Sequence, residues 1–103
     1  ENKTAFWEVY GEHETATNTL IDMRAKNIEK FADNYENLTD EVADEIVSTY
    51  MTSKAKQLKI QKTTYKKMKK IMGARQAARF IQIMNQVQLL IDVQIASEVP
   101  LIE

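Results

Sequence analysis

Apolar residues recur along the first third of the chain at steps of three and four positions. The series begins at Phe6 and Val9 and continues to Tyr35 and Leu38. At 100° per residue these positions stay within one narrow stripe, which is typical of an amphipathic α-helix. The pattern therefore predicts a long helix over residues 4–37.

A second helix is expected directly after Thr39. This threonine is followed by two acidic residues, which is the composition of a helix N-cap with negative charge at the positive end of the helix dipole. Apolar residues then recur with helical spacing as far as Met72, and Gly73 is the residue type most often found just beyond a helix C-terminus. This helix should cover residues 40–72.

The remaining pattern predicts a third, shorter helix over residues 74–97. Its apolar line includes Ala77, Phe80, Met84, Val87, Ile91 and Ile95, and two further apolar residues, Ile83 and Leu90, should widen this core stripe on one flank. Pro100 prevents the helix from continuing. We therefore predict an all-α fold, a long antiparallel helical hairpin plus a shorter third helix, in a single domain over residues 1–103.

Composition supports this fold class. A chain of 103 residues with two Gly and one Pro cannot supply the turns of a sandwich, a barrel or a doubly wound sheet. The absence of Cys excludes a disulfide framework, a thiolate metal site and a cysteine nucleophile. No apolar run approaches the roughly 18 residues needed to span a bilayer, so we expect no membrane span.

The predicted bundle is thin for its length. Each of the first two helices would be roughly 50 Å long at 1.5 Å per residue. Polar residues such as Arg24, Lys54 and Gln61 interrupt the apolar stripes, which leaves a marginal core for an isolated chain. We therefore expect pairing with a second copy as a homodimer.

Charge is strongly segregated along the chain, although the net charge is only -1. Residues 1–45 contain 12 acids and 4 bases, whereas residues 46–91 contain 10 bases and no acid. Folding the first two helices back on each other about Thr39 would bring the lysines alongside the acids of the first helix. Much of the basic charge should then be neutralised within the chain.

Six lysines of the second helix fall within an arc of about 140° opposite the apolar stripe. This lysine row consists of Lys56, Lys59, Lys62, Lys66, Lys67 and Lys70. The row is either a solvated helix face or a binding surface for nucleic acid, anionic lipid or an acidic protein. Nucleic acid is the least favoured of these partners, because no aromatic residues are interleaved on that face.

Arg24 and Lys54 occupy the centres of their apolar stripes at the same level of the hairpin. Two buried cations without a counter-charge would be costly. Folding the third helix back about Gly73 brings Asp92 to the same level, which predicts a polar layer of Arg24, Lys54 and Asp92, or else a water-filled groove. The alternative is that the long side chains reach past a thin core into solvent.

Catalytic and metal chemistry have little support in the sequence. His13 is the only histidine, so one chain cannot form a site with several histidines. Glu8 and Glu12 share a helix face and could at most form a weak divalent-ion site with His13. The alternative for His13 is a structural residue at the contact between two helices. No phosphate-binding loop, nucleophilic triad or paired buried carboxylates can be recognised. We expect no enzymatic activity, no cofactor and no resident metal.

Several short motifs are spread over nearly the whole chain: Phe6-Trp7, Leu38-Thr39-Asp40, Ala78-Arg79-Phe80 and Pro100-Leu101. In these the sequence resembles a set of small, uncharacterised, exported proteobacterial helical proteins. More distantly, a long hairpin with Leu-Thr opening a helix is similar to the Spy/CpxP group of periplasmic stress proteins, whose motif reads Leu-Thr-x-x-Gln. The resemblance implies a periplasmic, dimeric, non-catalytic protein whose signal peptide has been removed before Glu1.

Three functional hypotheses follow. The first is a periplasmic helical interaction protein, chaperone-like or stress-related, that binds apolar or charged segments of other proteins. The second is binding of an anionic polymer or a membrane surface through the face from Lys54 to Lys70. The third is a weak metal-responsive accessory protein that uses Glu8, Glu12 and His13.

Overall fold

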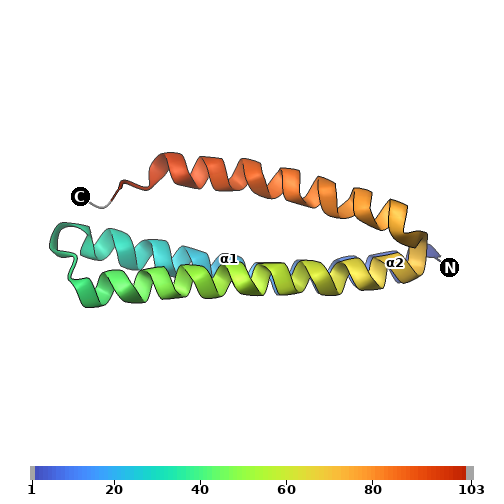
Figure 1. Cartoon of the computed structure of the whole chain (residues 1–103), viewed down its shortest axis with the longest axis horizontal. Helices are drawn as coiled ribbons and strands as arrows, with labels where there is room; N and C mark the ends of the chain where they lie inside the picture. Colours follow the sequence, from blue (N-terminus) through green and yellow to red (C-terminus); the bar gives the residue numbers. More distant parts are fainter. Residues whose placement is uncertain (1, 102–103) are drawn as a thin grey trace.

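The structure is a computed structural model that describes residues 2–101, with the side chains of residues 3–101. Helix α1 covers Asn2–Asn34, a short 3-10 helix η1 covers Tyr35–Asn37, and helix α2 covers Asp40–Glu98 (Figure 1). No strand occurs in the part of the chain that the structure describes, so the all-α prediction is confirmed. None of these helices is long and apolar enough to cross a membrane.

Helix α2 bends back on itself at Gly73, the one residue inside it with non-helical backbone angles (φ 86°, ψ 161°). We call residues 40–72 the N limb and residues 74–98 the C limb. The second and third helices expected from the sequence correspond to these two limbs, which meet at the kink at Gly73. The backbone angles of Gly73 fall in a region that essentially only glycine adopts. A Cβ at this position would meet nothing within 4 Å, so the backbone angle is the reason for glycine.

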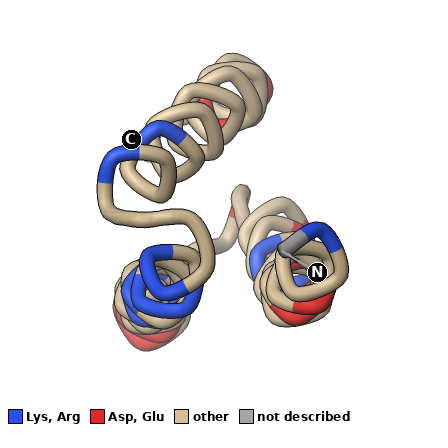
Figure 2. The backbone as a smooth tube through the Cα atoms, turned by 90° about the vertical axis from the view of Figure 1, so that its right-hand side faces the viewer, with Lys and Arg blue, Asp and Glu red and all other residues tan. Residues whose placement is uncertain are grey.

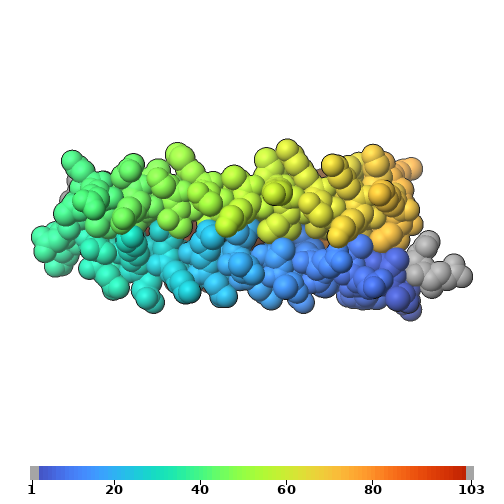
Figure 3. Space-filling view, turned by 90° about the horizontal axis from the view of Figure 1, so that it is seen from below, coloured from blue at the N-terminus to red at the C-terminus, as the bar shows by residue number. Residues whose placement is uncertain are grey.

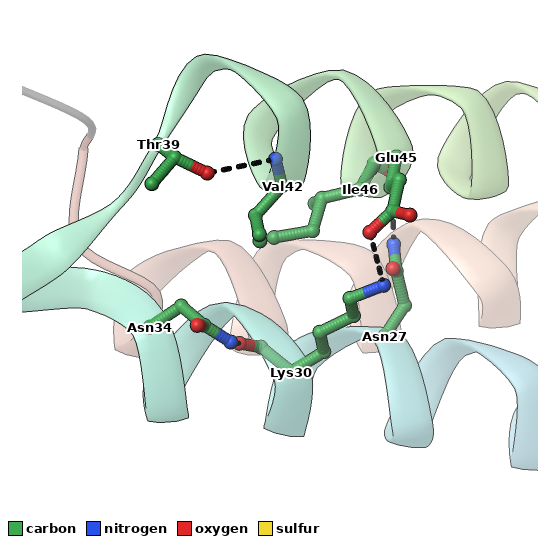
Figure 4. Close-up of polar contacts among 7 residues, drawn as sticks. All are labelled: Asn27, Lys30, Asn34, Thr39, Val42, Glu45 and Ile46. Atoms are coloured by element: carbon green, nitrogen blue, oxygen red, sulfur yellow. Dashed lines mark hydrogen bonds and ion pairs between the residues drawn. The ribbon is translucent and has the colours of Figure 1, made fainter.

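The turn between α1 and α2 is defined by local hydrogen bonds (Figure 4). The Thr39 hydroxyl accepts a hydrogen bond from the backbone N–H of Val42 over 3.2 Å, which confirms the predicted N-cap. The expectation that the first helix continues to residue 37 is wrong in its last turn. Asn34 Nδ2 donates to the carbonyl of Lys30, which satisfies a free carbonyl at the helix end, and residues 35–37 tighten into a 3-10 turn.

Side-chain contacts fix the register of the three helical rods, which are α1, the N limb and the C limb. Lys30 Nζ lies 2.7 Å from Glu45 Oε1, which pins α1 against the N limb close to the turn. Gln61 Nε2 donates to Asn85 Oδ1 over 2.7 Å, and these two residues are equally distant from Gly73 in the sequence. The two limbs of α2 are therefore antiparallel about Gly73, and α1 runs parallel to the C limb.

The molecule is elongated, with principal extents of 55 × 21 × 17 Å. Its radius of gyration is 16.7 Å, whereas a compact chain of this length should have a value of about 13 Å. α1 and the N limb lie side by side along the whole length in Figure 3. Seen end-on in Figure 2, α1 and the two limbs occupy the corners of a triangle.

The core is concentrated at the Gly73 end. Val9, Met68 and Ala77 form its buried centre, and the last two are fully buried. Phe80 of the C limb packs edge-on against Phe6, with ring centroids 5.9 Å apart, and aromatic pairs of this geometry add stability beyond the area that they bury. Toward the other end the core thins to isolated buried residues such as Phe31.

Candidate binding groove and polar layer

An apolar groove of about 900 Å³ opens between α1 and the two limbs of α2, at the end of the molecule opposite Gly73. This volume is within the range typical of ligand pockets. Its apolar lining comprises Ile28, Phe31, Ile46, Val47, Ile95, Ala96, Val99, Pro100 and Leu101. All three rods contribute to this lining.

The groove exists because of the size of the side chains that face it. At the Gly73 end the rods are joined by large aromatic residues such as Phe6 and Phe80. At the groove end the C limb presents the small Ala96, and Val99 follows directly after the limb; these side chains leave the space between α1, the N limb and the C limb unfilled. The chain beyond the C limb is held by the Tyr35 hydroxyl, which donates to the Leu101 carbonyl over 3.0 Å.

The structure brings together the three residues of the predicted polar layer. Arg24 Nη1 lies 2.8 Å from Asp92 Oδ1, and Gln88 Nε2 donates to the same oxygen over 3.0 Å. Lys54 Nζ lies 3.7 Å from Asp92 Oδ2. All three members of the layer also line the groove, so the layer forms its inner end.

The environment of Asp92 favours its charged form. Burial by itself raises the pKa of Asp92, but hydrogen bonds from Gln88 and Arg24 and the charges of Arg24 and Lys54 outweigh it. The pKa of Asp92 is therefore lower than its ordinary value of 3.8. The layer as a whole contains two cations and one carboxylate, which leaves one surplus positive charge at the groove. At 3.7 Å the Lys54 ammonium is too far from Asp92 for a good hydrogen bond, and it is partly exposed.

A second, smaller hollow of about 340 Å³ lies on the far side of the polar layer. It shares Arg24 and Lys54 with the groove. Its apolar lining comprises Leu20, Ile21, Ile60, Met84, Val87 and Ile91. The polar layer therefore joins the C limb to the hairpin between two places where the rods do not pack tightly.

The C limb exposes much more apolar surface than the sequence analysis expects. Ile83 and Leu90, expected to widen the core stripe, are 46% and 73% exposed. Val87 and Ile91 of the expected core line are also exposed. The reason is geometric, since the C limb touches the hairpin with one narrow face and its flanks find no partner in the described part of the chain.

All six residues of the lysine row are exposed. Figure 2 shows basic residues gathered on the N limb at the Gly73 end. Lys67 Nζ lies 2.7 Å from Glu12 Oε1, and the other five lysines form no ion pair with any acid that the structure describes. Among the described residues, the acids of α1 therefore neutralise one lysine of the row, Lys67.

His13 lies at the seam between α1 and the N limb. Its Nδ1 is 3.0 Å from Thr64 Oγ1, and its ring is half-buried next to Phe80. Burial lowers the pKa of His13 below its ordinary value of 6.5, because the charged form loses hydration.

The residues of the hypothetical metal site are not gathered around His13. Glu12 pairs with Lys67 instead. Among residues 2–101 no group of three or more histidine or acidic side chains is positioned to hold a metal ion. The geometry therefore gives no support to a metal-responsive role for Glu8, Glu12 and His13.

The groove itself is the site that sequence reasoning missed. Phe31 and Ile95 have the spacing of ordinary core residues, and periodicity alone does not show that the space between them is unfilled. The available signal was Ala96, the one alanine in the second half of the C limb.

Comparison of the chain with protein-family models, with curated proteins and with solved structures finds no match. Functional inference therefore depends on the geometry of the groove, the polar layer and the exposed faces.

Proposed function

We propose that this protein is a non-catalytic helical interaction protein that binds apolar segments of other proteins in the groove. The observation that carries the proposal is the groove itself, about 900 Å³ in volume, with a predominantly apolar lining from all three rods. Apolar surface left open to water in this way is characteristic of recognition sites. An amphipathic helix or an extended apolar segment would bury its apolar face there.

The polar layer would orient such a segment. An acidic side chain on the bound segment could reach Lys54, whose ammonium is partly exposed and not tightly bound to Asp92. Charge complementarity of this kind contributes to specificity and association rate more than to affinity. The groove would thus favour apolar segments that carry an acidic residue over purely apolar ones.

A periplasmic location and a chaperone-like, stress-related role belong to the same proposal. They are supported by the resemblance of the sequence to exported helical proteins and to the Spy/CpxP group. The homodimer is part of this proposal as well, and the exposed apolar flanks of the C limb favour it.

The test is suppression of aggregation of a chemically unfolded client protein at low salt. Val47→Glu places a charge in the groove, and Met51→Glu places the same charge one turn along the N limb, outside the groove lining. Both residues are exposed, at 44% and 63%, so both variants should fold. We expect stoichiometric suppression by the wild type and by Met51→Glu, and its loss in Val47→Glu. Absence of suppression by the wild type, or equal suppression by both variants, would contradict the proposal.

The alternative function is binding of an anionic polymer or membrane surface through the lysine row. The observation that favours it is that five of the six exposed lysines have no acidic partner among the described residues. Each lysine near an anionic membrane surface contributes about 1 kcal/mol of binding free energy. Retention on such a surface should fall steeply with salt, because counterions are released on binding.

A matched pair of double variants tests this alternative. Lys62→Glu with Lys66→Glu reverses two charges of the row, and Lys3→Glu with Lys26→Glu makes the same net change on α1. The alternative predicts that only the first pair abolishes retention on heparin or on vesicles that contain anionic lipid. Equal loss with both pairs would mean that net charge, and not the lysine row, is responsible.

A further inference from the structure

The C limb is apolar on its inner face and on both flanks, and its polar residues Arg75, Arg79, Gln82 and Gln86 follow one line on the opposite side. Its inner face buries Ala77 fully, yet its outer positions Leu89 and Leu90 are 62% and 73% exposed. Large apolar residues that lie exposed together along a helix flank are characteristic of a surface that another molecule covers. Between Arg79 and Glu98 the C limb contains one charged residue, Asp92, which is already paired within the chain.

The exposed residues include a regular line. Ile83, Val87 and Leu90 follow one another at steps of four and three residues, so they lie along one side of the helix. We call these three residues the outer stripe. The same spacing forms the contact seam when two helices pack with their side chains interlocked. Ile21 of α1 is also exposed, and it lines the smaller hollow together with Val87. The exposed apolar surface therefore extends from the outer stripe toward α1.

We propose that the outer stripe pairs with the outer stripe of a second copy of this chain, with the two C limbs antiparallel across a two-fold axis. A two-fold interface places the same surface on both partners, so that surface must be compatible with itself. The outer stripe itself meets this condition, because all three of its residues are apolar. The nearest charged residue on this side is Arg79, one turn before Ile83, and in an antiparallel pair the two Arg79 side chains lie at opposite ends of the contact. Homodimer interfaces are also more apolar than the general protein surface.

Charge distinguishes this face from the other exposed apolar face of the molecule. That face contains Met51, Leu58 and Leu89, on the side where the two limbs of α2 meet. Lys62 is exposed and, four residues after Leu58, lies next to it on the N limb, and the exposed Lys69 continues the same side of the helix toward Gly73. Two-fold pairing there would bring lysines of both copies together, and juxtaposed like charges oppose association.

The homodimer is part of the proposed function, and the pairing of the outer stripes deepens that proposal by naming the interface, which leaves the groove free. The groove is lined by inner positions of the C limb, such as Ile95, and the outer stripe lies on a different side of the helix. Dimer formation and client binding are therefore separable properties. Val47→Glu should lose client binding and remain a dimer.

Sedimentation equilibrium at micromolar concentrations tests the assembly on the full chain. The wild type should have twice the chain mass of 11.9 kDa. Leu90→Glu should have the mass of a single chain, and Leu89→Glu, the same change at the adjacent exposed residue, should remain a dimer. Circular dichroism should show equal helix content in all three proteins. A monomeric wild type, or a Leu90→Glu variant that remains a dimer, would overturn the proposal.

Cross-linking gives a second readout that does not depend on a disruptive substitution. The chain contains no cysteine, so a single introduced cysteine can react only with its counterpart in a second copy. Val87→Cys lies at the centre of the outer stripe and should form a disulfide-linked dimer under mild oxidation, because a two-fold axis there brings the two thiols close together. Leu89→Cys should not. Efficient cross-linking at position 89 with none at position 87 would assign the dimer to the other apolar face and overturn this one.

Discussion

Arg24 of α1 donates a hydrogen bond to Asp92 of the C limb over 2.8 Å and thereby joins residues that are 68 positions apart in the sequence. Asp92→Asn retains the shape of the side chain but removes its charge, so that Arg24 and Lys54 lose their counter-ion. We expect the free energy of unfolding to fall by about 1–3 kcal/mol, as for other hydrogen bonds to charged groups. Urea denaturation at neutral pH measures this loss.

The matched control for this pair is Glu45→Gln, which breaks the exposed ion pair with Lys30. Exposed ion pairs of this kind contribute about 1 kcal/mol or less. If Asp92→Asn destabilises the protein no more than Glu45→Gln, the polar layer has no special role in holding the C limb.

The two glycines should respond to alanine in opposite directions. Gly73→Ala forces a side chain into a positive-φ conformation and should cost about 1–3 kcal/mol of stability. Gly11→Ala lies inside α1, where a Cβ would meet nothing within 4 Å, and should stabilise the protein by about 0.4–1 kcal/mol. Thermal unfolding of both variants checks the signs. Stabilisation by Gly73→Ala would contradict the backbone conformation described for the bend.

The cap at Thr39 should contribute measurably to the start of α2. Thr39→Ala removes the acceptor for the Val42 N–H and should destabilise the protein by about 1 kcal/mol, whereas Thr39→Asp should retain most of the stability. Thr52→Ala is the comparison, because Thr52 is an exposed residue in the interior of the N limb. That change should be neutral or slightly stabilising, since alanine is the better helix former. Equal destabilisation at positions 39 and 52 would argue against the cap.

His13 should make stability depend on pH in the mildly acidic range. Burial lowers its pKa in the folded protein below 6.5, so the unfolded chain binds a proton first as the pH falls. The contribution of neutral His13 is therefore complete above pH 6.5 and is lost as the pH falls from there toward the folded pKa. Because the chain has one histidine, a single NMR titration curve gives the folded value directly.

The control for this effect is His13→Gln, whose stability should be flat across the same pH window. Asp92 adds a further loss of stability at lower pH, because its pKa in the folded protein is below 3.8 and its contribution disappears as the pH falls through that region. A wild-type melting temperature that does not change between pH 7 and pH 5 would rule out a buried neutral His13.

Much of the fold can be read from the sequence because its signals are local. The cap at Thr39 and the bend at Gly73 depend on backbone chemistry at single residues, and both occur where the pattern predicts them. The last turn of α1 could not be predicted in the same way. Its change to a 3-10 turn accompanies a side-chain hydrogen bond from Asn34, which periodicity does not encode.

The candidate site was only partly accessible from the sequence. The polar layer follows from register, since residues equally distant from a bend face each other. The groove does not, because it depends on how well side chains such as Ala96 fill the space between rods. The sequence does not predict the exposure of Leu90 for a related reason. Helical spacing of apolar residues indicates a packing face, but it does not show whether that face packs within the chain or against another molecule.

The bend at Gly73 also determines which shapes are available to this sequence. Glycine adopts ordinary helical angles as well, so one change of backbone conformation would turn α2 into a continuous rod of 59 residues, roughly 90 Å long. In such a rod the C limb no longer packs against α1 and the N limb of its own chain. It can pack against α1 and the N limb of a second copy instead, which is a domain swap. We expect small-angle X-ray scattering to detect the longer species first in Gly73→Ala, because alanine penalises the bend and favours the straight helix.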